Sequence, residues 1–199
     1  MLFRSVETIA AAERHGFGLK DIRLTYRRKL DSSYPAPQLP PGVLIRSSRP
    51  DDAQVLEAIA EGSYTDSRFY FDRRFSRAQA DEMYRTWIRQ SVAGQADVVL
   101  VLEHESQAAG FITCHLFDPR TGQCRLGGLG SALRGRGLGQ KLYESALHWF
   151  AVQGIEEVVY VTQARNIVAQ RLFQRLGFLS HSTQLWYHKW FEQTVAKAA

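Results

Sequence analysis

The stretch that decides the fold is Arg134-Gly135-Arg136-Gly137-Leu138-Gly139. It lies between a predicted strand at 124–129 and a predicted amphipathic helix at 138–153, so the glycines form the turn that leads into the helix. A glycine lets the backbone come close to a ligand because no Cβ stands in the way. The first N–H groups of a helix have no partner inside the helix and lie at the positive end of its dipole. With two arginines beside them, these groups predict a site for a phosphate or pyrophosphate group.

A basic turn that contains glycine by chance is the alternative to this interpretation. Two nucleotide-binding motifs are excluded by spacing, because the turn has neither the G-x-G-x-x-G of a dinucleotide fold nor the G-K-[ST] of a P-loop. A second region further along the chain narrows the choice. There, a predicted buried strand at 158–162 is followed by Asn166, by a predicted helix at 167–176 that contains Phe173, and by Gly177-Phe178.

The pattern Arg134-x-x-Gly137-x-Gly139, together with this second region, resembles the coenzyme A signature of the GNAT N-acetyltransferase superfamily. The resemblance covers residues 43–190, most of the chain. It implies an α/β fold of the GNAT type, in which a mixed central sheet carries helices on both faces, here with a short N-terminal helix–strand appendage. It also implies an enzyme, an acyltransferase that moves the acetyl group of acetyl-coenzyme A to a primary amine.

The resemblance assigns the contacts to coenzyme A residue by residue. The backbone amide of Leu129, on the strand before the turn, is the expected oxyanion donor, and the amides of residues 133–140 are expected to hold the pyrophosphate. Asn166 is expected to bond the pantetheine, although it can also cap the helix that follows it. The expected cofactor-binding residues are Leu129, Arg134, Gly135, Arg136, Gly137, Leu138, Gly139, Gln140, Asn166 and Phe173.

Phe173 departs from the family pattern, because many relatives carry there a tyrosine whose hydroxyl protonates the departing thiolate. Three interpretations remain open. The first is that the thiolate leaves without help, because its thiol has a pKa of about 8.5. The second is that Tyr187 or a water molecule supplies the proton. The third is that the protein binds coenzyme A without turning it over. No general base stands out, and the candidates are His115, Glu103, His104 and a chain of water molecules.

The acceptor side is expected in the aromatic and arginine-rich segment 64–75. Arg68, Phe69, Asp72 and Phe75 of this segment, with Trp186 near the end, resemble a narrower group, the bacterial dTDP-fucosamine (dTDP-4-amino-4,6-dideoxygalactose) acetyltransferases of surface polysaccharide synthesis. That resemblance implies a nucleoside-diphosphate amino sugar as substrate, with its diphosphate on arginine and its base or sugar on an aromatic ring. For any single aromatic residue, packing in the core is the alternative. Acetylation of a protein N-terminus or lysine is the alternative reaction, and it would require an open acidic groove.

Composition adds further expectations. The chain has 199 residues, a net charge of +5 and two cysteines, Cys114 and Cys124. The charge suits an anionic partner such as coenzyme A but is not concentrated enough to predict nucleic-acid binding. Neither cysteine has the clustered spacing of a metal site, so no metal is expected. The chain lacks an apolar run of the roughly 20 residues that span a membrane and an apolar signal segment, so we expect a cytoplasmic protein without a membrane partner.

The sequence divides the chain into three parts. Residues 1–31 contain a predicted helix and a predicted strand, which are too small to fold alone. Residues 32–42 hold four of the six prolines and predict an extended linker. Residues 43–192 form the predicted acetyltransferase domain. We expect the first part to dock on this domain or on a second copy of the chain, which would give a homodimer.

Overall fold

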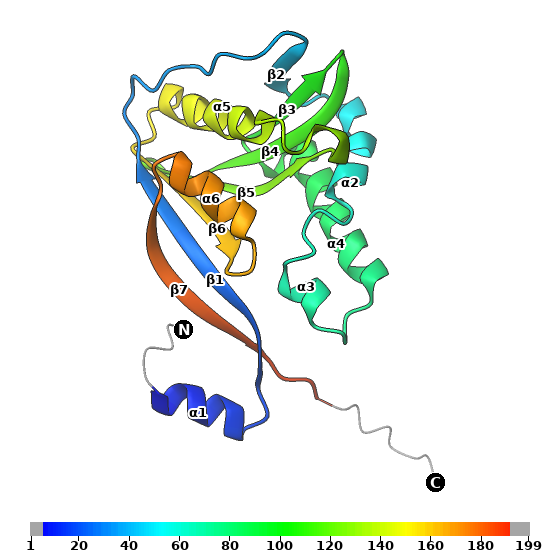
Figure 1. Ribbon diagram of the computed structural model, residues 1–199, viewed down its shortest axis with the longest axis vertical. Helices are drawn as coiled ribbons and strands as arrows, with labels where there is room; N and C mark the ends of the chain where they lie inside the picture. The colour runs from blue at the N-terminus through cyan, green and yellow to red at the C-terminus, as the bar shows by residue number, and fades with distance from the viewer. Residues whose placement is uncertain (1–5, 192–199) are drawn as a thin grey trace.

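The computed structural model describes residues 6–191, which form seven strands and six α-helices (Figure 1). The strands are β1 (Gly18–Lys29), β2 (Val43–Ser47), β3 (Val98–His104), β4 (Gln107–Asp118), β5 (Thr121–Leu129), β6 (Glu157–Gln163) and β7 (Leu179–His188). The helices are α1 (Val6–Arg14), α2 (Ala53–Ala60), α3 (Arg68–Phe71), α4 (Arg77–Gln90), α5 (Leu138–Val152) and α6 (Ile167–Arg175). The strand and the helix predicted on either side of the glycine turn are confirmed as β5 and α5.

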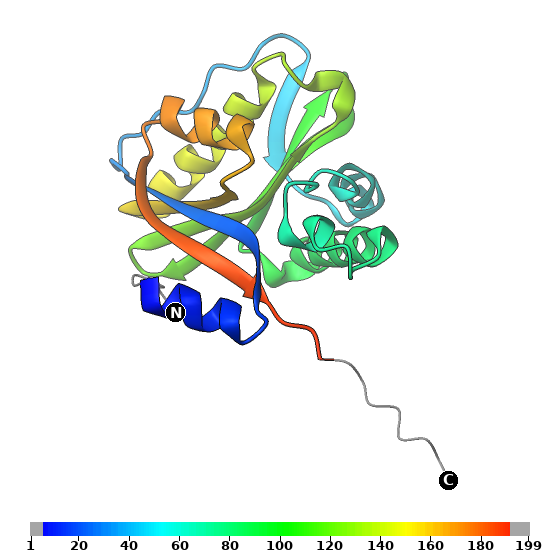
Figure 2. The same ribbon diagram turned by 60° about the horizontal axis from the view of Figure 1, so that its bottom comes forward.

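The strands join one mixed sheet in the order β2-β3-β4-β5-β6-β1-β7. The β5–β6 pair is parallel and the other neighbouring pairs are antiparallel, so the sheet is mixed, as predicted. Helices α5 and α6 cover one face and helices α2 and α4 the other (Figures 1 and 2). Alternate side chains of a strand point to opposite faces, so Leu100 and Leu102 of β3 pack in the cluster under α5 and α6. Val99 and Val101 pack in the cluster that contains α2 and α4.

Strand β1 lies inside the sheet, between β6 and β7, and is antiparallel to both. The segment after β1 crosses to β2 at the opposite edge of the sheet, and α1 lies at the far end of the β1–β7 pair with none of its residues buried (Figures 1 and 2). The predicted division of the chain at residues 31 and 42 stays a prediction. The structure shows that β1, which belongs to residues 1–31, joins the sheet whose other strands all belong to residues 43–192. Residues 1–5 and 192 of these parts lie outside the described residues.

Local capping signals fix where two helices beside the site begin. The Ser76 hydroxyl accepts a hydrogen bond of 3.2 Å from the Gln79 amide, and the Gln79 side chain accepts one of 3.0 Å from the Ser76 amide. This capping box starts α4. Asn166 caps α6 with a single bond, because its Oδ1 accepts a hydrogen bond of 3.0 Å from the Ala169 amide. The Asn166 cap lies at the cavity described next, which the later part of α4 also borders.

Candidate active site

A cavity of about 380 Å³ opens where β5 and β6 separate. The two strands pair from Thr121 with Glu157 to Cys124 with Tyr160, and their remaining residues are not paired with each other. The cavity is bordered by the unpaired end of each strand, by the start of α6 and by the segment around α3. It therefore brings Asn166 and Phe173, two of the expected coenzyme A contacts, into one space with Arg68 and Phe69 of the predicted acceptor segment. Among the described residues that line it, none belongs to the glycine turn.

The backbone of β5 turns two N–H groups toward this opening. The Leu126 amide donates to Thr113 Oγ1 of β4 at 3.0 Å, so it points toward β4. Successive residues of a strand direct their backbone groups to alternate sides, so the amides of Gly127 and Leu129 point away from β4. Their carbonyls agree with this direction, since Gly127 O accepts from the Tyr64 hydroxyl at 3.2 Å and Leu129 O accepts from Arg134 Nε at 3.1 Å.

Gly127 lines the cavity, whereas Leu129 lies two residues nearer the turn. The amide of Leu129, the predicted oxyanion donor, thus points toward the space between the unpaired ends of β5 and β6. The amide of Gly127 is a second N–H donor on the same side, and Gly127 lines the cavity. Sequence reasoning missed Gly127. The pair Gly127-Gly128 was the available signal, because glycine inside a strand often marks a close approach of another group.

The glycine turn has the backbone geometry that its sequence predicts. Gly135 and Gly137 have φ angles of 78° and 76°, in the left-handed region that favours glycine, and Gly137 is the N-cap of α5. Within residues 6–191, the amides of residues 135–139 donate to no backbone carbonyl. Arg136 is exposed, and Arg134 reaches back to the Leu129 carbonyl. Free amides at a helix N-terminus beside arginine side chains can bind a phosphate group.

Asn166 and Phe173 of the second predicted region both border the cavity. Asn166 is the α6 cap and still presents its side chain there. Phe173 is 2% exposed and stacks on Tyr160, with ring centres 4.9 Å apart and an angle of 6° between the planes. The structure places both residues at the cavity, and Phe173 brings no hydroxyl to it. Their expected contacts with the pantetheine stay predictions.

The predicted acceptor residues fall into two places. Arg68 and Phe69 line the cavity, and the Arg68 guanidinium lies 4.2 Å from the centre of the Phe69 ring and 3.9 Å from that of Trp186. Asp72 and Phe75 are not among the side chains that line it. They pack instead against the end of β7 and the segment that follows it.

Asp72 and Phe75 hold that segment in place. Asp72 is 2% exposed and accepts hydrogen bonds from His188 Nδ1 at 2.7 Å and from Trp190 Nε1 at 3.0 Å. Phe75 packs on the Trp190 ring at 5.0 Å. Burial by itself would raise the pKa of Asp72, but the hydrogen bonds from Trp190 and His188 outweigh it and lower the pKa to about 2. These contacts are structural anchors between α3 and β7.

Strand β1 adds two charged side chains that sequence reasoning did not assign to the site. Asp21 and Arg23 both line the cavity, and they share one face of β1 because they are two residues apart. Asp21 is 3% exposed; burial raises the pKa of its carboxyl, and the nearby Arg165 offsets this only in part. Arg23 lies 5.6 Å from the centre of the Trp186 ring. The sequence does show Asp21 and Arg23 as two charged residues on one face of a predicted half-buried strand. It does not show that this strand lies between β6 and β7, which is what brings the two side chains to the cavity.

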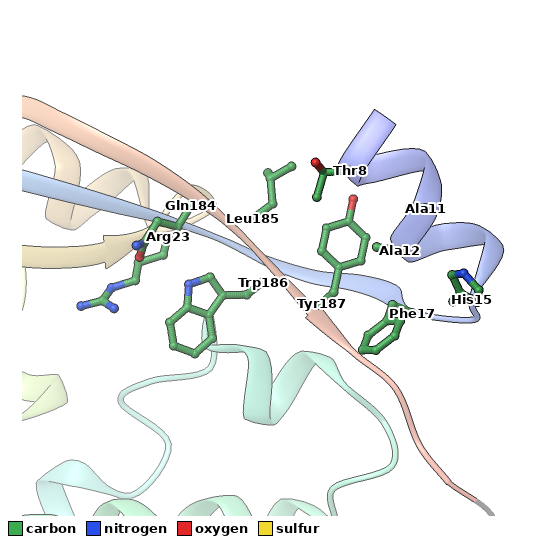
Figure 3. Close-up of a pocket in the computed structure, with 10 residues that line it drawn as sticks. All are labelled: Thr8, Ala11, Ala12, His15, Phe17, Arg23, Gln184, Leu185, Trp186 and Tyr187. Atoms are coloured by element: carbon green, nitrogen blue, oxygen red, sulfur yellow. The ribbon is translucent and has the colours of Figure 1, made fainter. Parts of the chain in front are cut away.

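The two predicted proton-transfer residues lie elsewhere. His115 is buried beside a neighbouring pocket lined by Gln90 and Gln95, and its Nε2 lies 3.3 Å from Thr113 Oγ1; burial lowers its pKa. Tyr187 points toward α1, beside Thr8, because it follows Trp186 on β7 and so faces the opposite side (Figure 3). Neither side chain borders the cavity between β5 and β6, and their predicted roles stay predictions.

Two absences hold for residues 6–191. No group of three or more His, Cys, Asp or Glu side chains in this range is arranged to hold a metal ion. Over the same residues, no helix is both long enough and apolar enough to cross a membrane.

Comparison with known proteins supplies the family. Residues 62–178 match the family described as "Acetyltransferase (GNAT) family". The spore coat polysaccharide biosynthesis protein SpsD of Bacillus subtilis (strain 168) is 27% identical over 153 residues, which cover 76% of this chain and 52% of SpsD. A mycothiol acetyltransferase of Saccharopolyspora erythraea is 26% identical over 178 residues, covering 87% and 56% of the two chains. This chain thus spans about half the length of these relatives.

A solved structure agrees with the fold. The GCN5-related N-acetyltransferase from Sphaerobacter thermophilus superposes with a TM-score of 0.67 and 19% identity, and the match covers 94% of this chain and 57% of that one. Asp21, Arg23 and Trp186 of the cavity lie outside residues 62–178, the segment that matches the family.

Proposed function

The chain belongs to the GNAT acetyltransferase family, and from that premise we propose that it acetylates the amino group of a nucleotide-linked aminodeoxy sugar. The observation that carries the acceptor is the arrangement of Arg23, Arg68 and Trp186 around one cavity, with Asp21 beside them. Acetyl-coenzyme A, which members of the family use, is the acyl donor.

The donor fits the turn and the gap between the strands. The free amides of residues 135–139 and the Arg136 side chain would hold the pyrophosphate. The pantetheine would lie between the unpaired ends of β5 and β6, close to Asn166. The amide of Gly127, with that of Leu129 behind it, would donate to the carbonyl oxygen of the thioester when negative charge develops there. Bound in this way, acetyl-coenzyme A supplies an acetyl thioester to an amine in the same cavity.

Half-buried arginines support an anionic acceptor. Within residues 6–191, neither Arg23 nor Arg68 forms an ion pair, and each instead stacks on Trp186. Burial lowers the pKa of both side chains, yet a guanidinium stays charged. Asp21 attracts the Arg68 guanidinium without forming a salt bridge with it. A partly desolvated guanidinium that forms no salt bridge favours an anionic ligand, and its geometry suits phosphate. The neighbouring rings of Phe69, Trp87 and Trp186 offer stacking surfaces for a base or sugar.

Asp21 supports an amine as the reacting group. Among the described residues that line the cavity, it is the acidic one. A carboxylate can hold an ammonium group and take its proton, and a raised pKa brings the carboxyl closer to the range in which a base works. We therefore assign Asp21 to the acceptor amine, as its binding partner and base.

The alternatives are less well supported. A peptide acceptor would favour an open acidic groove, whereas this cavity has Arg23, Arg68 and Arg125 against Asp21. A protein that only binds coenzyme A would not need an acceptor cavity of this kind. Because some relatives are named mycothiol acetyltransferases, an acceptor other than a nucleotide-linked sugar is the remaining alternative for this chain. A cytoplasmic location and a homodimer remain part of the proposal.

The test is a panel of acceptors. The purified protein is incubated with acetyl-coenzyme A and one of three acceptors, and both free thiol and product mass are followed. The acceptors are dTDP- and UDP-linked aminodeoxy sugars, the same sugars without the nucleotide, and a peptide with a free N-terminus and a lysine. We expect one acetyl group to be added to a nucleotide-linked sugar. A peptide product would contradict the proposal, and so would coenzyme A binding without thiol release for any sugar.

A further inference from the structure

Tyr143 of α5 places its hydroxyl over Gly127. A Cβ atom added to Gly127 would lie 2.7 Å from this hydroxyl oxygen, so the oxygen is directly beside the backbone of β5. Tyr143 lines the cavity between β5 and β6. Over residues 6–191, its hydroxyl makes no hydrogen bond and is therefore available to a ligand. The phenol thus lies next to the proposed oxyanion donor, where the thioester would react.

Tyr143 lies beside Phe173, so its hydroxyl can take the role of the tyrosine that many relatives carry at position 173. Its ring centre is 5.8 Å from that of Phe173 and 5.1 Å from that of Tyr160, so the three rings form one group. Phe173 has no hydroxyl. The Tyr160 hydroxyl is 3.3 Å from Cys124 Sγ, and Tyr160 is not among the residues that line the cavity. Of these three rings, only Tyr143 brings a free hydroxyl to the cavity.

We propose that Tyr143 is the catalytic acid that protonates the departing coenzyme A thiolate. This inference rests on the proposed acetyl transfer. The amine nitrogen attacks the thioester carbon, and the carbonyl electron pair moves to the oxygen held by the Gly127 amide. The electron pair on that oxygen then re-forms the C=O bond, the C–N bond remains and the C–S bond breaks, so sulfur takes the electron pair of the C–S bond and the Tyr143 proton. The phenolate regains a proton released by the attacking amine, directly or through Asp21 and water.

The environment keeps the phenol protonated until it is needed. Burial is the main cause that raises the pKa of Tyr143, and the nearby Cys124 and Cys114 add to it. At neutral pH the side chain is therefore in its acid form. The thiolate that forms within hydrogen-bond distance is itself the base, so the Tyr143 proton moves to sulfur only as negative charge develops there.

Removal of this one hydroxyl is the first test. Tyr143→Phe should lower kcat by about a hundredfold, the order expected for a lost general acid, with the KM for acetyl-coenzyme A unchanged within about twofold. Tyr160→Phe is the matched control, because it removes a hydroxyl from the same ring group outside the cavity, and it should keep most of the activity. Adding Phe173→Tyr to Tyr143→Phe should restore much of kcat, because a phenol then returns to the cavity at a neighbouring residue of the ring group that also lines it.

A second measurement needs no acceptor. In the complex with free coenzyme A, thiolate absorbance gives the pKa of the bound thiol. Tyr143→Phe should raise this pKa by about one unit, since a hydrogen bond to the thiolate favours the charged form. Tyr160→Phe should leave the pKa as it is in the wild type.

The outcomes separate this inference from the proposed function. If the wild type acetylates no acceptor but Tyr143→Phe shifts the thiol pKa, the acceptor proposal fails and the assignment of Tyr143 stands. Unchanged kcat and thiol pKa in Tyr143→Phe would overturn the assignment. Equal losses in Tyr143→Phe and Tyr160→Phe would overturn it as well, because they would report disturbed packing of the ring group.

Discussion

The Arg68 guanidinium lies 3.9 Å from the centre of the Trp186 ring, which joins α3 to the last strand of the sheet. Arg68 lies in the segment that matches the family, and Trp186 lies beyond its end at residue 178. Their contact forms one wall of the cavity that we assign to the acceptor. Stacking on an indole fixes the direction of the guanidinium while leaving its N–H groups free for an anion.

Arg68→Ala should weaken the acceptor and spare coenzyme A. We expect the KM for a nucleotide-linked sugar to rise about tenfold to a hundredfold, the effect of losing one charge-assisted hydrogen bond. Arg73→Ala is the control, because Arg73 is exposed in the same segment and lines a different pocket. Steady-state kinetics and titration with coenzyme A measure the two effects. Equal changes in both variants would argue against the acceptor wall.

The turn before α5 gives a prediction for donor binding. Arg136→Ala should raise the dissociation constant of coenzyme A about tenfold, because the variant loses a charge-assisted contact to the pyrophosphate. Arg134→Ala should have a similar or larger effect, since Arg134 also ties the turn to the Leu129 carbonyl. The control is Arg120→Ala, an exposed arginine at the other end of β5 that pairs with Glu156. Affinity that stays unchanged in both turn variants would remove the turn from the donor site.

Asp21 should appear in the pH profile. Burial raises the pKa of its carboxyl, so kcat should fall as the pH is lowered through that raised value, where the base becomes protonated. Asp21→Asn should lower kcat about a hundredfold at neutral pH and abolish this acidic limb, while coenzyme A affinity stays the same. Asparagine keeps the shape and can still accept the hydrogen bond from the Ile22 amide. If kcat of Asp21→Asn still fell at acidic pH as in the wild type, that fall would be due to a group other than Asp21.

Asp72 should matter for stability and not for the reaction. The pKa of its carboxyl is lowered to about 2 in the folded protein, so its contribution is present above the ordinary value near 4 and is lost as the pH falls toward 2. Asp72→Asn should lower the free energy of unfolding by about 2 kcal/mol at pH 7. Denaturant unfolding at several pH values should show the difference from the wild type shrinking between about pH 4 and pH 2. A large loss of kcat/KM at temperatures where the variant is folded would return Asp72 to the acceptor site.

Local signals were sufficient for most elements of this fold. The glycine turn and the Asn166 cap each depend on neighbouring residues, and the structure confirms the helices that they begin. The order of strands is different, because it depends on contacts between residues far apart in the chain. Arg23 of β1 pairs in register with Gln163 and with Gln184, and nothing in the alternation of β1 indicates either partner.

The same limit explains which site residues were predicted. Arg134, Gly137, Asn166 and Phe173 lie in short motifs whose spacing is visible in the sequence. The acceptor side that we propose combines β1, α3 and β7, and Asp21 reaches the cavity only because β1 lies between β6 and β7. Arg68 and Asp72 are four residues apart, yet one lines the cavity and the other anchors the segment after β7. Composition could not separate these two roles.

The most direct test of the account compares one amino sugar with and without its nucleoside diphosphate as acceptor for acetyl-coenzyme A. We predict that kcat/KM is at least about a hundredfold higher for the nucleotide-linked form, since its phosphates would meet Arg23 and Arg68. The preference should shrink by about tenfold or more in Arg68→Ala. Equal kcat/KM for the two forms, or a preference that survives in Arg68→Ala, would contradict the proposal that this cavity binds a nucleotide-linked amine.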